Sequence, residues 1–299
     1  MCGIVGLHLR DATLYPQLGA LLTDMLDAMC DRGPDSAGMA VYGDPTWSPE
    51  GEATVSLLNS PIPAAELAHI LSEHLGVTVT GHDLEPTLVL HAAVTSDALT
   101  AAVRASVPAA LVIGFGDDLT VLKGMGNPTD LANRFGLPRA SGWQGVAHTR
   151  MATESAVTAA GSHPFAVGPD QCLVHNGSFS NHMSIKHDLE RAGVSFDSEN
   201  DTEVGARFVA KQLAEGVDLE KALLMLNETF DGFYTLLVSN RDSFAVVRDA
   251  ISCKPAIIAE TDRWVAMASE YRALAHLPGI DNARIFEPEP EEVYVWHRQ

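Results

Sequence analysis

The chain begins MCGIVGL (residues 1–7), which places a cysteine directly before a glycine and a short apolar strand. Removal of Met1 would leave Cys2 at the amino terminus, with a thiol and a free α-amine on one carbon. Such an amine titrates near about pH 8, so it can accept the thiol proton and later return it to a leaving group. The stretch is therefore typical of an N-terminal nucleophile. A cysteine that is inert in a core strand would also fit these seven residues.

Composition narrows the classes of protein to which this chain can belong. It has 299 residues, a hydrophobic fraction of 46% and a net charge of −20. This length allows one large domain or two small ones with a sizeable core. The acidic balance argues against nucleic acid as a partner, because a phosphate backbone requires basic patches. No apolar run reaches the ~18 residues of a membrane span, and nothing reads as a signal peptide. We expect a cytoplasmic protein with no membrane partner.

The cysteines and histidines do not predict a metal or a cofactor. Four cysteines show no paired spacing, so we expect free thiols: Cys2, Cys30, Cys172 and Cys253. The chain contains twelve histidines but no HExxH or CxxC motif. It also has no glycine-rich nucleotide loop and too few cysteines for an iron–sulfur cluster. We therefore expect no cofactor and no metal in this chain.

Hydrophobic periodicity predicts many strands with helices before and between them. Helices are expected at 16–29, 64–75, 95–106, 127–135, 180–192, 201–215 and 219–230. Strands are expected at 3–9, 39–42, 54–58, 88–92, 111–113, 119–122, 233–238, 244–248, 256–259, 264–268 and 293–296, with others ending in polar residues at GVAHTRMAT, SHPF and CLVHNGS. This order indicates an α+β protein in which stacked sheets are covered by helices.

Two of the polar clusters supply groups that suit acyl-transfer chemistry. In VHNG a strand delivers Asn176 and Gly177 at a turn, where a side-chain amide and a backbone N–H could stabilise an oxyanion. A plain Asn-Gly turn is the other interpretation. Arg150 ends the strand in HTR and could bind a carboxylate through two hydrogen bonds, or could form a surface ion pair instead.

Asp201 completes this set of candidate residues. It stands at the expected start of a helix, where it could serve as an N-cap or could hold the ammonium group of a ligand. Together with Cys2, Arg150 and Asn176, it would form a site for an amino acid whose side chain bears an amide. That ligand is glutamine or asparagine.

Eight stretches occur in an order that resembles a known family. They are CGIVG, RGPDSAG, HTRMAT, SHPF, VHNG, NDTE, VRDAISCKPAIIA and ASEYRAL. They are similar to the motifs of class II glutamine amidotransferases, from Cys2 to about Leu274, interrupted by residues 48–140. Any one of these motifs is weak evidence, whereas eight in family order are specific.

The resemblance implies a fold and a set of site residues. The fold would be the four-layer αββα sandwich of N-terminal-nucleophile hydrolases. The matching positions are Cys2 as nucleophile, Asn176 and Gly177 as oxyanion donors, Arg150 and Asp201 for the carboxylate and amine of glutamine, Thr153 and His163 in the pocket wall, and Arg32 and Asp35 in a loop near the nucleophile. The family usually has tryptophan where this chain has Met151, a flexible side chain that can fill the same wall.

The resemblance also implies that this chain is a subunit. We expect residues 1–299 to form one amidotransferase domain, with an insertion or subdomain at about 48–140 that docks a partner or bears a lid. Only about 25 residues follow ASEYRAL, so the ammonia-consuming synthase is expected on another polypeptide. The chain resembles the glutaminase subunit of glutamate-synthase-type complexes, N-methylglutamate synthase in particular. In those complexes the partner subunits carry a flavin and an iron–sulfur cluster.

Two other functions stay open from the sequence alone. The chain could be an N-terminal-nucleophile amidase for another amide, although only a free amino acid needs both Arg150 and Asp201. It could also be a glutamine-sensing or scaffold subunit that keeps the pocket without turnover. A measurement of glutaminase activity would distinguish these two functions from that of a glutaminase subunit.

Overall fold

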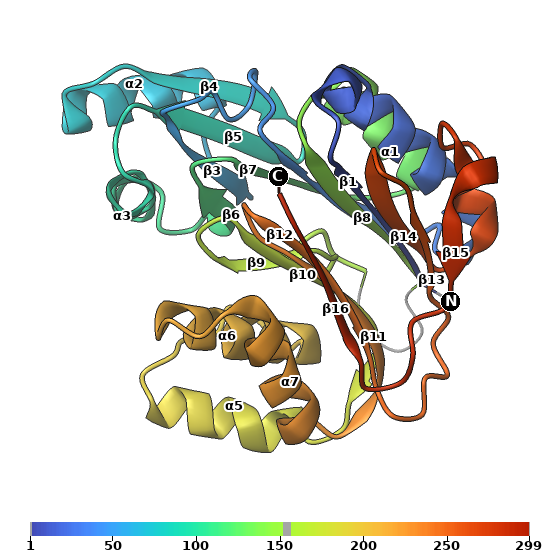
Figure 1. The fold of residues 1–299 in the computed structure, drawn as a ribbon. Coiled ribbons are helices and arrows are strands. Elements are labelled where there is room, and N and C mark those ends of the chain that lie inside the picture. The colour runs from blue at the N-terminus through green and yellow to red at the C-terminus, as the bar shows by residue number, and fades with distance from the viewer. Residues whose placement is uncertain (1, 152–156, 299) are drawn as a thin grey trace.

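The first strand, β1 (Gly3–Leu9), lies near the middle of a seven-stranded antiparallel sheet (Figure 1). The structure, a computed structural model, describes residues 2–151 and 157–298. Every residue of β1 is buried, because this sheet is covered by helices on one face and by a second sheet on the other. A strand buried on both faces reads as a continuous apolar run, as β1 does.

The side chains of β1 alternate between these two layers. Val5 and Leu7 contact the helices, whereas Ile4 contacts the second sheet. A Cβ at Gly6 would lie only 2.4 Å from Leu237 Cδ2, so glycine is needed here for the two sheets to approach.

Three sheets make up the β structure of the described chain. The seven-stranded sheet has the order β15 (Arg284–Phe286), β13 (Ile257–Glu260), β14 (Trp264–Ala268), β1, β8 (Gln144–Arg150), β2 (Ser36–Tyr42), β7 (Leu119–Met125). The five-stranded sheet has the order β16 (Val293–His297), β12 (Ser243–Arg248), β11 (Gly232–Ser239), β10 (Gln171–Phe179), β9 (Phe165–Gly168). The four-stranded sheet has the order β4 (Val79–Leu84), β5 (Thr87–Ala92), β3 (Ala53–Leu58), β6 (Leu111–Gly116).

Helices cover the outer face of each sheet (Figure 1). The seven-stranded sheet carries α1 (Leu18–Asp27) and α4 (Pro128–Phe135), with the short 3-10 turns η1 (Ala12–Gln17), η2 (Cys30–Arg32), η3 (Leu137–Arg139), η4 (Tyr271–Ala273) and η5 (Ile280–Asn282). The five-stranded sheet carries α5 (His182–Arg191), α6 (Asp201–Ala214) and α7 (Leu219–Thr229). The four-stranded sheet carries α2 (Ala64–Leu75) and α3 (Ser96–Ser106). The first two sheets and their helices form the predicted αββα sandwich, which confirms the α+β fold class.

The segment 48–140 divides between two parts of the molecule. Residues 53–116 form the four-stranded sheet with α2 and α3, whose side chains build a hydrophobic core of their own. The chain then returns to the sandwich, because β7 pairs with β2 and α4 packs on α1.

Most predicted elements agree with the structure, and two strands were missed. β4 has the sequence VTGHDL, in which glycine, histidine and aspartate hide any apolar alternation. β15 has only three residues, all partly or fully exposed. The helix expected from residue 16 begins at Leu18, because Pro16 lies within the preceding 3-10 turn.

Candidate active site

Most of the predicted site residues meet at one end of the sandwich, where β1 begins. Cys2 precedes β1, and Arg150 ends the neighbouring strand β8. Asn176 and Gly177 lie on β10 of the facing sheet, and Asp201 opens α6. Thr153, the second residue expected in the pocket wall, lies outside the described residues.

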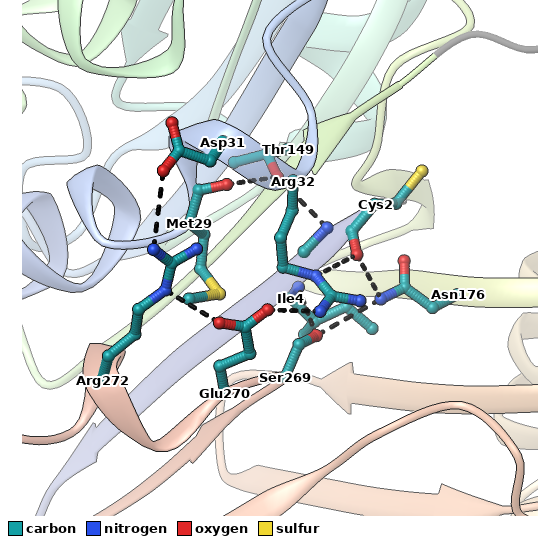
Figure 2. A network of polar contacts seen from close by, with 11 residues as sticks. Cys2, Ile4, Met29, Asp31, Arg32, Thr149, Asn176, Ser269, Glu270 and Arg272 are labelled. Atoms are coloured by element: carbon teal, nitrogen blue, oxygen red, sulfur yellow. Dashed lines mark hydrogen bonds and ion pairs between the residues drawn. The ribbon is translucent and has the colours of Figure 1, made fainter.

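Cys2 is half-buried, and hydrogen bonds hold its main chain in place (Figure 2). Its carbonyl oxygen accepts from Arg32 Nε at 2.9 Å and from Asn176 Nδ2 at 3.3 Å. The next residue, Gly3, donates its backbone N–H to Thr149 Oγ1 at 3.1 Å. The thiol sulfur of Cys2 lies 3.9 Å from the Met151 carbonyl oxygen, a long contact for a weak donor.

Arg32 belongs to a chain of charges behind Cys2 (Figure 2). Its guanidinium pairs with Glu270, and this contact is the main cause that lowers the pKa of the Glu270 carboxyl. Arg272 Nε lies 2.8 Å from the other oxygen of Glu270, and Arg272 Nη1 lies 3.6 Å from Asp31. The Arg32 side chain therefore holds the backbone of Cys2. Asp35 in the same loop donates its N–H to the Arg150 carbonyl oxygen at 3.2 Å.

The Asn176 amide is held at both ends. Its Nδ2 donates to the Cys2 carbonyl oxygen and to Ser269 Oγ, each at 3.3 Å. Its Oδ1 lies 3.0 Å from His148 Nε2. The following residue, Gly177, has φ +142°, and a Cβ there would lie 1.9 Å from the Phe233 carbonyl oxygen. Only glycine fits this position.

Arg150 comes from β8, and Asp201 comes from the first turn of α6. Arg150 is largely buried, and its Nη1 lies near Gly161, where an added Cβ would be 3.1 Å away. Asp201 Oδ2 accepts from the Phe179 N–H at 2.9 Å, which ties the carboxylate to β10. The prediction that Asp201 is an N-cap is wrong, because Asn200 occupies that position and its side chain accepts from the N–H of Thr202.

Three buried histidines lie beneath these groups, and only His163 among them was predicted from the sequence. His163 Nε2 and His175 Nδ1 each lie 2.9 Å from Thr202 Oγ1, and the rings of His148 and His163 are 4.1 Å apart. Burial lowers the pKa of His148 to about 3 and that of His175 to about 4, and lowers the pKa of His163 well below its usual value. All three are therefore neutral near pH 7.

A signal for His148 was present in the sequence. In HTR, residues 148 and 150 are two positions apart on a strand and share one face. Because Arg150 was predicted to bind substrate, this spacing also indicated that His148 faces the same site. His175 is one residue before Asn176, so strand alternation places it on the opposite face, toward α6.

The described residues contain neither a cluster of metal ligands nor a membrane-spanning helix. In residues 2–151 and 157–298, no group of three or more His, Cys, Asp and Glu side chains is arranged to hold a metal ion. Over the same residues, no helix is both long and apolar enough to span a bilayer. All four cysteines are free thiols.

An αββα sandwich whose central strand starts at a cysteine, opposite an Asn-Gly pair, is the arrangement of class II glutamine amidotransferases. This chain belongs to that family. A family model described as a glutamine amidotransferase domain matches residues 148–276. The chain is 48% identical over 304 residues to glutamine amidotransferase-like protein GlxB of Rhizobium meliloti (strain 1021), covering 100% of this chain and 99% of that protein. It is 30% identical over 311 residues to a putative glutamine amidotransferase of Methanothermobacter thermautotrophicus, covering 99% of each.

Solved structures agree on the fold. The glutamine phosphoribosylpyrophosphate amidotransferase of B. subtilis superposes with a TM-score of 0.61 at 17% identity, covering 99% of this chain and 49% of that chain. A structure described as the allosteric regulatory enzyme of purine biosynthesis superposes with a TM-score of 0.64 at 18% identity, covering 98% of this chain and 46% of that one. This chain thus spans about half of each.

The buried histidines predict a specific dependence of stability on pH. Below about pH 6.5 the unfolded chain takes up protons at these rings, whereas folded His148 stays neutral down to about pH 3. The unfolded state then binds more protons, so the free energy of unfolding should decrease as the pH falls from 6.5 toward 3. Each histidine should contribute about 1 kcal/mol per pH unit until the pH reaches the pKa of its folded form, which is about 4 for His175.

Urea unfolding at pH 7, 6 and 5 tests this expectation with two variants. His148→Gln should reduce the loss of stability between pH 6 and 5 by about 1 kcal/mol. His69→Gln changes a histidine whose side chain is 75% exposed and should leave the pH dependence as in the wild type. An unchanged slope in His148→Gln would show that His148 titrates normally in the folded state.

Proposed function

We propose that this chain is a glutaminase subunit that converts L-glutamine to glutamate and ammonia and passes the ammonia to a separate synthase subunit. The observation that carries the proposal is the hydrogen bond from Asn176 Nδ2 to the carbonyl oxygen of Cys2, the residue before the central strand. It brings a nucleophile and an oxyanion donor together in a half-buried position. Arg150 and Asp201 lie around the same end of the sandwich, where a free amino acid would need a cation and an anion.

The first half of the reaction forms a thioester. With Met1 removed, the α-amine of Cys2 accepts the thiol proton as the sulfur attacks the side-chain amide carbon of glutamine. The negative charge that develops on the amide oxygen is stabilised by Asn176 Nδ2 and by the N–H of Gly177. The carbon–nitrogen bond then breaks, and the protonated α-amine returns its proton to the departing nitrogen, which leaves as ammonia.

The second half of the reaction frees the enzyme. The α-amine removes a proton from water, whose oxygen attacks the thioester carbonyl and displaces the Cys2 sulfur. Glutamate leaves, and the thiol regains its proton. The same two donors serve both tetrahedral intermediates, so their position matters twice per turnover.

Glutamine is oriented by charges at its other end. Arg150 binds the α-carboxylate and Asp201 binds the α-ammonium group, with Thr153 and His163 in the pocket wall. Asp201 suits this role because the Phe179 N–H fixes its carboxylate, while 22% of its side chain stays exposed to a ligand. His163 is held through Thr202, the residue that follows Asp201.

Exposed apolar side chains at the nucleophile end support a protein partner there. Met151, Phe233, Ile251 and Tyr271 all lie close to the ends of the strands that carry the site, and Ile251 is 69% exposed. Apolar side chains that gather on a surface mark sites of protein–protein contact. We expect the partner to be a synthase of the glutamate synthase type, N-methylglutamate synthase in particular, with its flavin and iron–sulfur cluster on the partner subunits.

The part of the chain at 48–140 adds to this surface. A groove of about 1080 Å³ lies between the four-stranded sheet and the sandwich, and its walls include Pro61, Glu85 and Met125. Met125 is the register partner of Ser36, which is the partner of Arg150, so the groove starts about 10 Å from Arg150. The segment acts as an insertion that extends the docking surface of a single amidotransferase domain.

The nucleophile is tested by Cys2→Ala and Cys2→Ser. Both variants should fold and release almost no glutamate from glutamine, because neither carries an activated thiol. Cys253→Ala is the control, since Cys253 is exposed and outside the set of site groups. Mass spectrometry of the active protein should show that Met1 is absent and that a glutamine-analogue electrophile labels Cys2 alone. Full activity in Cys2→Ala would refute the proposal.

Substrate orientation is tested by Arg150→Gln and Asp201→Asn. Each removes one charge-assisted contact, so kcat/KM for glutamine should fall roughly 30- to 1000-fold. Arg191→Gln removes an arginine from an exposed ion pair on α5 and should leave kcat/KM unchanged. Equal losses for glutamine and for an amide without charged groups would show that these residues do not read the amino acid.

Coupling to a synthase is tested by comparing the lone chain with its native complex. A complex isolated through a tag at the carboxyl end should hydrolyse glutamine faster per copy of this chain, because docking completes the site as lids do. Its absorption spectrum should show flavin and iron–sulfur chromophores. Equal rates in the lone chain and the complex would instead favour a free-standing glutaminase.

A further inference from the structure

The orientation of the Asn176 amide is determined by what surrounds it (Figure 2). The Cys2 carbonyl oxygen can only accept a hydrogen bond, so the nitrogen end of the amide must face it. Ser269 Oγ, which accepts the Ile4 N–H at 2.9 Å, lies 3.3 Å from the same amide nitrogen. The oxygen end of the amide therefore points away from the nucleophile, toward His148.

The same logic determines the state of His148. Asn176 Oδ1 can only accept, so His148 Nε2 must carry a hydrogen and donate it across the 3.0 Å contact. The ring is fully buried, and its Nδ1 has no hydrogen-bond partner among the described residues. The ring of His163 lies against it at 4.1 Å. His148 is thus a buried, neutral ring that donates a hydrogen bond to the oxygen of the Asn176 side-chain amide.

We propose that His148 is a positioning residue for the glutaminase reaction, because its Nε2–H holds the Asn176 amide with the nitrogen end toward the reacting atoms. The proposal rests on the proposed function. Rotation of the amide by half a turn would place Oδ1 against the Cys2 carbonyl oxygen and against the developing oxyanion. His148 opposes that rotation, because the flipped amide would lose the hydrogen bond that its oxygen accepts from the Nε2–H.

The effect should fall on the chemical step. Ground-state binding of glutamine depends mainly on the charges of Arg150 and Asp201, whereas the amide contact strengthens as the oxygen becomes negative. Loss of the His148 donor should therefore lower kcat and leave KM nearly unchanged. A residue that only filled space would not produce this split.

The chain offers a matched control in His8 on β1. His8 is fully buried, its Nδ1 lies 2.7 Å from the side-chain amide oxygen of Gln144, and its Nε2 has no partner among the described residues. It pairs with Val265 and Gln144, at the end of β1 far from Cys2. A change at His8 should therefore disturb packing as a change at His148 does, without touching the site.

The test compares His148→Phe, His148→Gln and His8→Phe in glutamine hydrolysis. His148→Phe keeps a ring but has no donor, so kcat should fall about 10- to 100-fold with KM within about threefold. His148→Gln keeps a side-chain N–H and should recover most of the lost kcat. His8→Phe should retain the wild-type kcat. Wild-type kcat in His148→Phe, or an equal loss in His8→Phe, would overturn the proposal.

Two further measurements separate this proposal from the proposed function. The aldehyde analogue of glutamine forms a tetrahedral adduct with the thiol, so its affinity relative to that of glutamate should drop in His148→Phe only. NMR of the chain with 15N-labelled asparagine reports the Asn176 NH2 group without any turnover. His148→Phe should shift or split that signal and His148→Gln should not. An inactive wild type would refute the proposed function, while an Asn176 signal unchanged in His148→Phe would refute the role of His148.

Discussion

The burial of β1 between a helix layer and a second sheet is the constraint on which the rest of the structure depends. A strand buried on both faces has one stable register, because a shift by one residue would exchange the side chains of its two faces. Hydrogen bonds from Gly3 to Thr149 and from Ile4 to Ser269 fix the start of this strand. The position of Cys2 follows directly, so the packing of the core also determines where Cys2 lies.

The second constraint is the layer of neutral histidines beneath the site. Burying an imidazole costs free energy unless its nitrogen atoms find partners, and His148, His163 and His175 each have one nitrogen without a partner among the described residues. Each ring instead uses its other nitrogen to hold a site group or its neighbour Thr202. These unpartnered nitrogens lower the stability of the fold. Because the rings stay neutral, the groups around the site do not change charge near pH 7.

The sequence predicted the layers because apolar periodicity is strongest where burial is greatest. The helix 64–75 and the strand 3–9 agree with the structure at both ends, since each ends where burial or a glycine ends the pattern. The strand β4 was missed because one of its faces is open to solvent and carries polar residues. Short exposed elements leave no such pattern to read.

Prediction of the site depended on a different kind of information. The residue type alone suggested a chemical role for Cys2, Arg150 and Asn176, so these three were predicted. His148 was missed because its role exists only through the partner that it touches. The N-cap interpretation of Asp201 is wrong for the same reason, because Asn200 caps the helix and Asp201 is the first helical residue. Contacts of this kind appear only when the strands are placed side by side.

The pairing of β1 with β14 has a consequence for the biogenesis of the protein. Ile4 and Ser269 are 265 residues apart in the chain, yet their hydrogen bond fixes the start of β1, next to Cys2. Contacts of such long range form late, since the loop between them must close first. Synthesis proceeds at about 5–20 residues per second, so Cys2 is made well before Ser269. The segment around Cys2 therefore leaves the ribosome long before β14 can pair with it, and its native surroundings form only after β14 has been made.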